Sequence, residues 1–265
     1  MIRGGQFKAA VVASLVALAA MASEARAATC GNSAGGFEAW KKQYADESRG
    51  RFGASSISAL MGTHYSTAAI AADRGQRSFG LSLEQFMAKR GGSAIVARGR
   101  GLKRSQAGLF ASIQQRYGVQ PGPLIAIWGM ETGFGSQHGN QNMLSSIATL
   151  AYDCRRPDYF TDQLYAALQL IDRGTLSGST RGSMHGEIGQ TQFLPKTMLE
   201  YGIGNLDVAA NALASTANFL KAHGWRSGAG YQPGEPNFAA IQAWNAATVY
   251  EQAIALIGGK IDGVR

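Results

Sequence analysis

One glutamate stands at the end of an apolar stretch in the middle of the chain, where its chemistry suits acid catalysis. Residues 119–131 read Val-Gln-Pro-Gly-Pro-Leu-Ile-Ala-Ile-Trp-Gly-Met-Glu, with prolines where the first turn of a helix tolerates them. A helix that is apolar on nearly every side is buried. Burial and the negative end of the helix dipole both raise the pKa of a carboxyl group, as a general acid requires of Glu131. The alternative is a structural glutamate that caps a helix or pairs with an arginine.

Three other segments carry polar groups that core packing does not require. They are 155–159 (Arg-Arg-Pro-Asp-Tyr), 183–195 (Ser-Met-His-Gly-Glu-Ile-Gly-Gln-Thr-Gln-Phe-Leu-Pro) and 243–250 (Ala-Trp-Asn-Ala-Ala-Thr-Val-Tyr). Their side chains are candidates for a polar cleft around Glu131.

Apolar residues at helical spacing predict the elements that position these segments. We expect helices over 37–47, 55–61, 82–90, 95–117, 119–131, 142–152, 158–173, 205–224 and 236–257. Ser82 and Gln85 have capping-box spacing at the start of one of them. Because no stretch alternates strictly with β-branched residues, the predicted fold class is mainly α.

The chain is long enough for one sizeable domain. No low-complexity or proline-rich linker divides its 265 residues, so we expect a single domain over 28–265. A smaller helical lobe is expected at about 30–110, packed against the rest.

The first 27 residues have the pattern of a secretory signal peptide. Basic residues precede an apolar run of about 14 residues at 9–22, and Ala25-Arg26-Ala27 fits the cleavage pattern. The run is short for a membrane span, which needs roughly 20 residues, so we expect export without a stable span. An uncleaved anchor is the alternative, and the residues before Cys30 make a poor lipoprotein cleavage box.

The chain is basic, which favours an acidic partner. Residues 1–27 hold three basic residues and one acidic residue, so about +6 of the formal charge of +8 remains on the mature chain. Export argues against nucleic acid and leaves anionic lipid or an anionic cell-wall polymer. The basic residues between 98 and 116 form either a solvated face or a contact with such a polymer.

The two cysteines, Cys30 and Cys154, predict one disulfide in an oxidising compartment, and two unrelated buried thiols are the alternative. The four histidines stand singly, without metal-ligand spacing. We therefore expect no metal and no cofactor.

Three motifs together resemble the murein transglycosylases of the membrane-bound lytic transglycosylase B type. They are Glu-Thr-x-x-Gly from Glu131 after a Gly-Val-x-Pro turn, Gly-x-x-Gly-x-x-Gln-Phe-x-Pro at 186–195, and Ala-Asn-Phe-Leu-Lys-Ala-His-Gly-Trp at 217–225. The resemblance spans about 37–257. It implies a lysozyme-like helical fold, action on peptidoglycan in the periplasm and, we expect, a monomer.

The resemblance also implies roles for individual residues. Glu131 matches the catalytic acid and base. The others match residues that line the cleft or hold the glycan and its stem peptides: Ser183, Gln192, Arg155, Arg156, Tyr159, Asn245, Tyr250 and Trp244, the last standing where the family often has tyrosine. The calcium loop of some relatives would fall at 201–207, which is too short for the six or more oxygen ligands that calcium takes.

The implied reaction cleaves the β-1,4 bond between N-acetylmuramic acid and N-acetylglucosamine and forms 1,6-anhydromuramic acid. It needs one carboxylate, whereas ordinary glycosidases use two. Glu187 stands where many relatives have a small or apolar residue, so it is a candidate second carboxylate for hydrolysis, or else a solvated loop residue. A lysozyme-type muramidase and a non-catalytic cell-wall-binding protein are the alternative functions.

Overall fold

The computed structural model describes residues 29–75 and 80–264. The predicted signal peptide, 1–27, lies outside this part and stays a prediction. Within the described ranges, no helix has the length and the hydropathy that crossing a membrane would require.

The prediction of a mainly α fold is confirmed. The helices are α1 (Phe37–Glu47), α2 (Ala54–Met61), α3 (Thr67–Arg74), α4 (Leu83–Lys89), α5 (Gly92–Ser105), α6 (Ala107–Tyr117), α7 (Pro121–Thr132), α8 (Met143–Tyr152), α9 (Pro157–Asp172), α10 (Pro195–Tyr201), α11 (Ala209–Ala222), α12 (Phe238–Trp244) and α13 (Thr248–Asp262), with a short 3-10 helix at Ala34–Gly36. Two short strands, β1 (Gln141–Asn142) and β2 (Arg181–Gly182), pair antiparallel, with Gln141 opposite Gly182.

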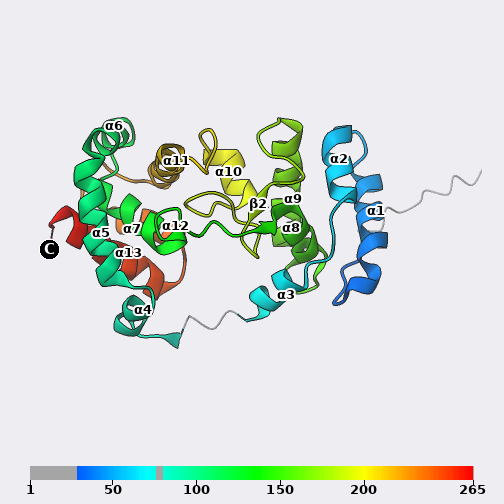
Figure 1. Ribbon diagram of the computed structural model, residues 1–265, viewed down its shortest axis with the longest axis horizontal. Coiled ribbons are helices and arrows are strands. Elements are labelled where there is room, and N and C mark those ends of the chain that lie inside the picture. The colour runs from blue at the N-terminus through cyan, green and yellow to red at the C-terminus, as the bar shows by residue number, and fades with distance from the viewer. Residues whose placement is uncertain (1–28, 76–79, 265) are drawn as a thin grey trace, which may run out of the picture.

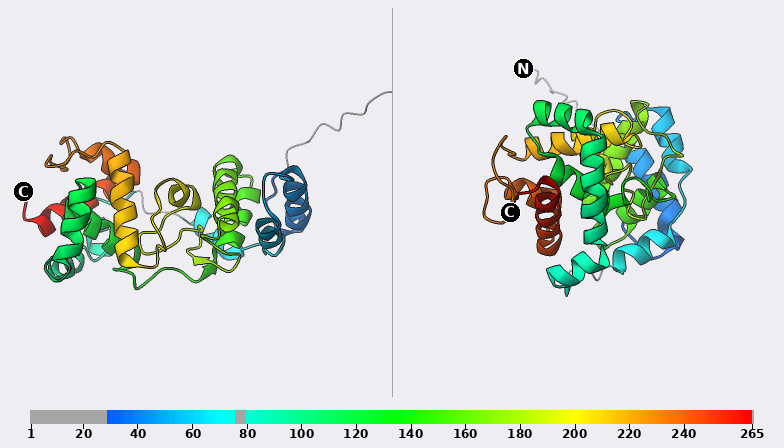
Figure 2. Two further views of the ribbon diagram at one scale, coloured as in Figure 1. Left: turned by 90° about the horizontal axis from the view of Figure 1, so that it is seen from above. Right: turned by 60° about the vertical axis from the view of Figure 1, so that its left-hand side comes forward.

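The helices form two groups along the length of an elongated molecule (Figures 1 and 2). In one group, α1, α2 and α3 pack on α8 and α9. In the other, α4 and α5 pack on α13, and α5 and α13 pack on α7. The segment between β2 and α11, with α10, lies between the two groups (Figure 1).

The expected helical lobe at about 30–110 is therefore wrong, because its two halves belong to different groups. Helices α1 to α3 join the α8–α9 group, while α4 and α5 join the α7–α13 group. Close packing shows that α5 belongs to the α7–α13 group. A Cβ at Gly99 of α5 would lie 2.8 Å from Ile125 of α7 and 2.7 Å from Ile261 of α13. Adjacency in sequence thus does not decide which helices share a core.

Helix α7 is the buried centre of its group, as its composition predicts. Residues 122–130 are all buried, and Leu124, Ile125 and Ile127 are fully inaccessible. The helix ends where Gly133 adopts the left-handed conformation, with φ of 57°, a standard way to close a helix. Glu131 thus lies in the last turn, at the point where the helix leaves the core.

Several helix boundaries differ from those predicted. Ser82 and Gln85 do form the capping box of α4. The helix expected over 95–117 is two helices, which meet at Gln106, and that expected over 205–224 begins later, at Ala209.

The expected helix over 236–257 is also broken, into α12 and α13. Asn245 adopts an extended conformation, and its Oδ1 accepts a hydrogen bond of 3.0 Å from the backbone N–H of Ala247. A side chain that bonds nearby backbone competes with helical hydrogen bonds, which explains the break.

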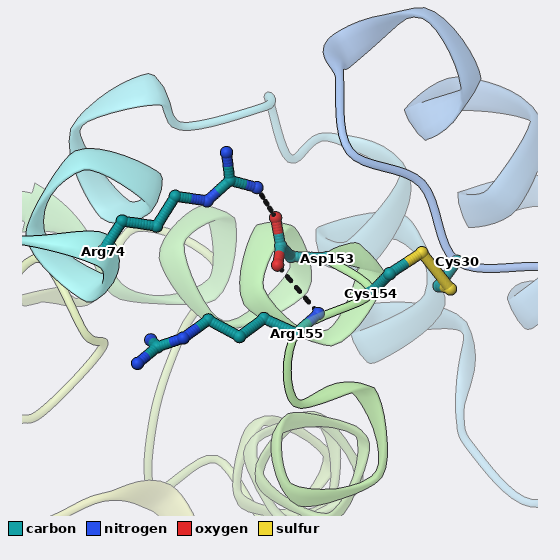
Figure 3. The surroundings of a disulfide bond; sticks show 5 residues. All are labelled: Cys30, Arg74, Asp153, Cys154 and Arg155. Carbon is teal, nitrogen blue, oxygen red and sulfur yellow. Dashed lines mark hydrogen bonds and ion pairs between the residues drawn. A yellow bond between two sulfur atoms is a disulfide. The ribbon is translucent and has the colours of Figure 1, made fainter.

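The disulfide between Cys30 and Cys154 is present and ties the start of the described chain to the end of α8 (Figure 3). Beside it, Gly31 N–H donates to the carbonyl of Tyr152 at 2.9 Å. The neighbouring Asp153 is buried and accepts from Arg74 of α3 at 2.7 Å and from the backbone N–H of Arg155 at 3.0 Å (Figure 3). The disulfide therefore adjoins an ion pair that holds α3 against α8.

Candidate active site

The Glu131 carboxylate accepts two hydrogen bonds from the broken segment between α12 and α13. The Tyr250 hydroxyl donates to Oε1 at 2.6 Å, and the Trp244 indole N–H donates to the same oxygen at 3.3 Å. Trp244 is the last residue of α12 and Tyr250 lies in the first turn of α13. The break at Asn245 lets both side chains reach one carboxylate oxygen.

The surroundings of Glu131 favour its protonated form. Removal from water raises its pKa to about 7, against the Tyr250 hydrogen bond, which lowers the pKa. The charge of Glu187 raises the pKa, whereas the Trp244 hydrogen bond and the charge of Arg90 lower it. A pKa near the working pH is what a group needs to give a proton and later take one.

Tyr250 remains a donor in either state of Glu131. Its ring is buried, and burial together with the adjacent Glu131 charge holds the pKa of the Tyr250 hydroxyl well above its ordinary value. The phenol therefore stabilises the Glu131 carboxylate once the proton has left.

Two hollows meet at Glu131, with volumes of about 340 and 390 Å³. Four residues line both: Glu131, Glu187, Gln192 and Asn245. The first hollow continues along Tyr159, Leu194, Thr197, Phe219 and Trp244, and the second along Phe86, Arg90, His185, Val249 and Tyr250. Glu131 thus lies where the two hollows join, so a bound chain molecule could extend to either side of its carboxyl group.

Ser183 holds Glu187. Its hydroxyl donates to Glu187 Oε2 at 2.8 Å, and the backbone N–H groups of His185 and Glu187 each donate to Ser183 Oγ at 3.1 Å. The backbone N–H of Ser183 also donates to the carbonyl of Glu187 at 2.8 Å. Glu187 is accordingly a fixed, half-buried part of the cleft and not a freely solvated loop residue.

Gln192 lines the cleft from an uncommon backbone conformation. Its φ is 55°, a left-handed value that costs free energy outside glycine. Its Nε2 donates to the carbonyl of Gly189 at 2.8 Å and more weakly to that of His138 at 3.4 Å. An isolated bridge between Ile188 and Phe193 closes this turn.

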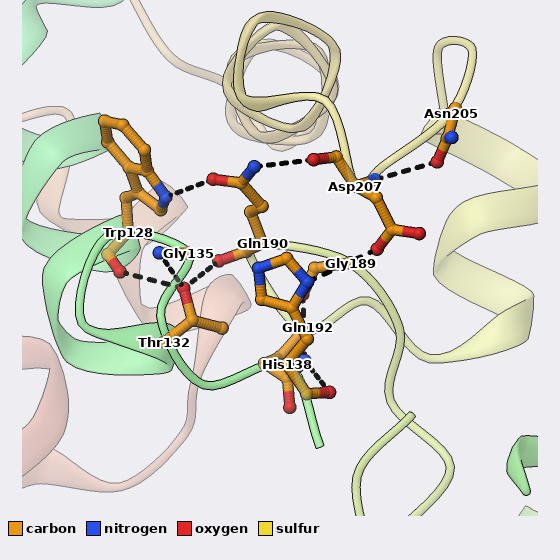
Figure 4. A network of polar contacts seen from close by, with 9 residues as sticks. All are labelled: Trp128, Thr132, Gly135, His138, Gly189, Gln190, Gln192, Asn205 and Asp207. Carbon is orange, nitrogen blue, oxygen red and sulfur yellow. Dashed lines mark hydrogen bonds and ion pairs between the residues drawn. The ribbon is translucent and has the colours of Figure 1, made fainter. Parts of the chain in front are cut away.

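A polar network that we did not predict joins the end of α7 to the 183–195 segment (Figure 4). Gln190 accepts from the Trp128 indole at 2.8 Å, donates to the carbonyl of Asp207 at 2.6 Å, and its carbonyl accepts from Thr132 at 2.7 Å. The network holds the helix end that carries Glu131 against the segment that carries Glu187. The sequence signal was a polar glutamine inside a glycine-rich motif.

Arg155 and Arg156 do not line these hollows, and both bind one aspartate. Arg155 and Arg156 both form ion pairs with Asp73 of α3, which is buried. Although burial favours neutral Asp73, hydrogen bonds from the two arginines hold the pKa of Asp73 below its ordinary value. Arg156 also lies over the ring of Tyr159, at 5.6 Å from its centroid, and Tyr159 does line the cleft.

In the described residues, no group of three or more histidine, cysteine, aspartate or glutamate side chains could hold a metal ion. Three of the basic residues of α5 make contacts within the chain: Arg98 with Phe134, Arg100 with the carbonyl of Lys260, and Lys103 with Asp262. Contact of this face with an anionic polymer stays a prediction.

The fold is shared with solved lytic transglycosylases. SltB3 of Pseudomonas aeruginosa, solved with NAG-anhNAM-pentapeptide, superposes with a TM-score of 0.78 at 27% identity, over 86% of this chain and 80% of that one. Slt35 of Escherichia coli, solved with calcium, shares the fold with a TM-score of 0.73 at 22% identity, over 84% of this chain and 92% of that one. These two solved structures share the mainly helical fold of the chain.

Residues 36–234 match the family described as the Transglycosylase SLT domain, and the chain belongs to this family. It is also 34% identical over 139 residues to membrane-bound lytic murein transglycosylase B of Escherichia coli K12. That match covers 46% of this chain and 38% of the length of the relative.

Proposed function

We propose that the chain is a peptidoglycan lytic transglycosylase in which Glu131 acts first as acid and then as base. The observation that carries the proposal is the Glu131 carboxyl group, with a pKa of about 7, placed between two sections of a cleft. Membership of the transglycosylase family supports the same reaction. The bond cleaved is the β-1,4 bond from N-acetylmuramic acid to N-acetylglucosamine.

In the first step, protonated Glu131 gives its proton to the glycosidic oxygen, and the bond from that oxygen to the muramic acid C1 breaks. N-Acetylglucosamine leaves with the proton, so Glu131 becomes a carboxylate. Tyr250 and Trp244 then donate hydrogen bonds to that carboxylate. Such donors, in place before the charge forms, lower the free energy of the transition state.

In the second step, the muramic acid 6-hydroxyl attacks C1 of its own sugar and Glu131 takes the hydroxyl proton. A 1,6-anhydro ring closes and the acid is restored. Because the nucleophile belongs to the substrate, its effective concentration is high and the enzyme needs no nucleophile of its own.

We propose that the remaining cleft residues bind the glycan. Tyr159 and Trp244 offer aromatic faces for sugar rings, while Gln192 and Asn245 offer amide groups. Arg155 and Arg156 are fixed by Asp73 and keep 44% and 40% of their side chains exposed, so they can meet the carboxylates of stem peptides. Ser183 acts through Glu187.

A lysozyme-type hydrolysis is the second candidate, because Glu187 lines both hollows with Glu131. A second carboxylate could activate a water molecule instead of leaving the attack to the 6-hydroxyl. We further propose that residues 1–27 direct export to the periplasm and that the mature protein acts as a monomer.

The deciding experiment is mass spectrometry of the muropeptides that the mature protein, beginning at Ala28, releases from purified peptidoglycan. We expect fragments one water lighter than hydrolysis products, without a reducing end. Reducing-end fragments would establish hydrolysis instead. If no fragments appear while the protein still sediments with peptidoglycan, the chain is a cell-wall-binding protein.

A further inference from the structure

Glu187 is the one carboxylate besides Glu131 among the described residues that line the two hollows. It stands on the segment that follows β2, far from α7 in sequence, and the Gln190 network fixes that segment to the end of α7. The two carboxylates therefore line one cleft from two segments that hydrogen bonds join.

Hydrogen bonds and close packing fix the position of Glu187. Its Oε2, backbone N–H and backbone carbonyl are all bonded to Ser183. The turn that carries it has no spare room, since a Cβ at Gly182 would lie 2.4 Å from the carbonyl oxygen of Glu187 and one at Gly186 would lie 2.4 Å from Ile147. A solvated surface glutamate would need none of these contacts.

We propose that Glu187 is a positioning residue whose negative charge keeps the proton on Glu131 until the glycosidic bond breaks, and that the Ser183 hydroxyl fixes Glu187 for this role. The inference rests on the proposed function. A like charge close to a carboxyl group disfavours its ionised form. After the proton has left, the same repulsion makes the Glu131 carboxylate a stronger base, which assists removal of the 6-hydroxyl proton.

Other groups around Glu131 raise or lower its pKa. Arg90, at the end of α4, lies over the rings of Phe86 and Tyr250 and favours the carboxylate, as does the Tyr250 hydrogen bond. His185 lines the second hollow and Tyr159 the first. Among these groups Glu187 carries the negative charge, so its effect on the pKa of Glu131 is opposite to that of Arg90.

The test is the substitution Glu187→Gln, which removes the charge but keeps the length and an oxygen that can accept from Ser183. We expect the pKa of Glu131 to fall below its wild-type value of about 7. Carbon-13 NMR titration of the glutamate carboxyl groups measures this without substrate, with the Glu131 resonance assigned by its loss in Glu131→Gln. The alkaline limb of the kcat/KM profile, which reports the free enzyme's acid, should move down by the same amount.

Two further variants separate this role from a structural one. Ser183→Ala keeps the charge of Glu187 but removes the hydrogen bond that fixes its carboxylate, so we expect the pKa of Glu131 to fall by less than in Glu187→Gln. In the double variant, the pKa of Glu131 should fall no further than in Glu187→Gln alone. Glu200→Gln removes an exposed carboxylate from α10 and should leave the titration unchanged. Circular dichroism establishes that each variant is folded.

An unchanged Glu131 titration in folded Glu187→Gln would overturn the inference and leave the proposed function intact. Loss of reducing-end products in that variant, if the wild type makes them, would also overturn it, because Glu187 would then act on water. If the wild type releases no muropeptides, the proposed function fails, yet the NMR titration still decides whether Glu187 controls the proton on Glu131.

Discussion

The hydroxyl of Tyr250 donates a hydrogen bond of 2.6 Å to Oε1 of Glu131, across a sequence separation of 119 residues. The bond joins the end of α7 to the start of α13, two helices that pack extensively on each other. The geometry of the candidate site is thus a consequence of how α7 and α13 pack in their half of the molecule.

Glu131→Gln should abolish lysis and spare binding. The amide keeps nearly the same shape but cannot give a proton, and loss of a general acid typically costs about 10²–10⁴ in rate. The measurement is clearing of a peptidoglycan suspension beside sedimentation with peptidoglycan. Glu84→Gln, an exposed carboxylate of α4, is the matched control. Undiminished clearing by Glu131→Gln would refute the assigned role.

Tyr250→Phe should shift the pH profile in the direction opposite to Glu187→Gln. The lost hydrogen bond normally lowers the pKa of Glu131, so its removal raises that pKa and moves the alkaline limb upward. We also expect kcat to fall about tenfold or more, because the carboxylate formed in the first step loses a donor. The check is kcat and kcat/KM across pH 5–9, roughly the range around neutrality in which the group titrates. A downward shift would contradict the geometry.

The free energy of unfolding should depend on pH because Glu131 is placed in the cleft. Its folded pKa, about 7, lies above the ordinary value, so the folded state binds more protons and loses stability as pH rises from about 4 to 7. Burial raises the pKa of Glu131, but the side chain also lines two open hollows and is only half-buried, so water screens part of the charge. We therefore expect Glu131→Gln to be more stable than wild type by about 1–2 kcal/mol at pH 8. The gain should vanish near pH 4. Urea unfolding at both pH values measures it.

Reduction of the Cys30–Cys154 disulfide should destabilise the chain. The bridge closes a loop with a sequence separation of 124, which corresponds to about 5 kcal/mol in the chain-entropy description. We expect a lower Tm in reductant and in Cys30→Ser/Cys154→Ser, and no free thiol in mature protein by non-reducing mass analysis. Two alkylatable cysteines in untreated protein would contradict the bridge.

Asp73→Asn should weaken substrate binding more than chemistry. The substitution leaves Arg155 and Arg156 without their shared ionised partner, so their side chains lose their fixed positions. We expect KM for stem-peptide-bearing glycan to rise several-fold with kcat within about twofold. We expect a stability loss of only about 1–2 kcal/mol, because the two arginines that lose their partner are partly exposed to water. Asp46→Asn, which affects an exposed pair, is the control. A fall in kcat alone would argue against this role.

Local sequence signals determined the parts of the protein in which short-range physics dominates. The prolines and apolar residues of 119–131 define a buried helix, the glycines after Glu131 end it, and Ser82 with Gln85 cap α4. Cysteine number determined the disulfide. The motif at 183–195 predicted a segment whose residues Glu187 and Gln192 line both hollows beside Glu131.

Only the tertiary structure decided which of these parts meet. The division of 30–110 between two groups depends on how the apolar face of α5 fits α7 and α13, and no local signal encodes that fit. The break at Asn245 depends on one side chain competing with the helix, and it turns Trp244 and Tyr250 onto one carboxylate oxygen. Likewise Ser183 binds Glu187, and the two arginines bind Asp73, because hydrogen-bonding partners are chosen by proximity in space and not along the chain.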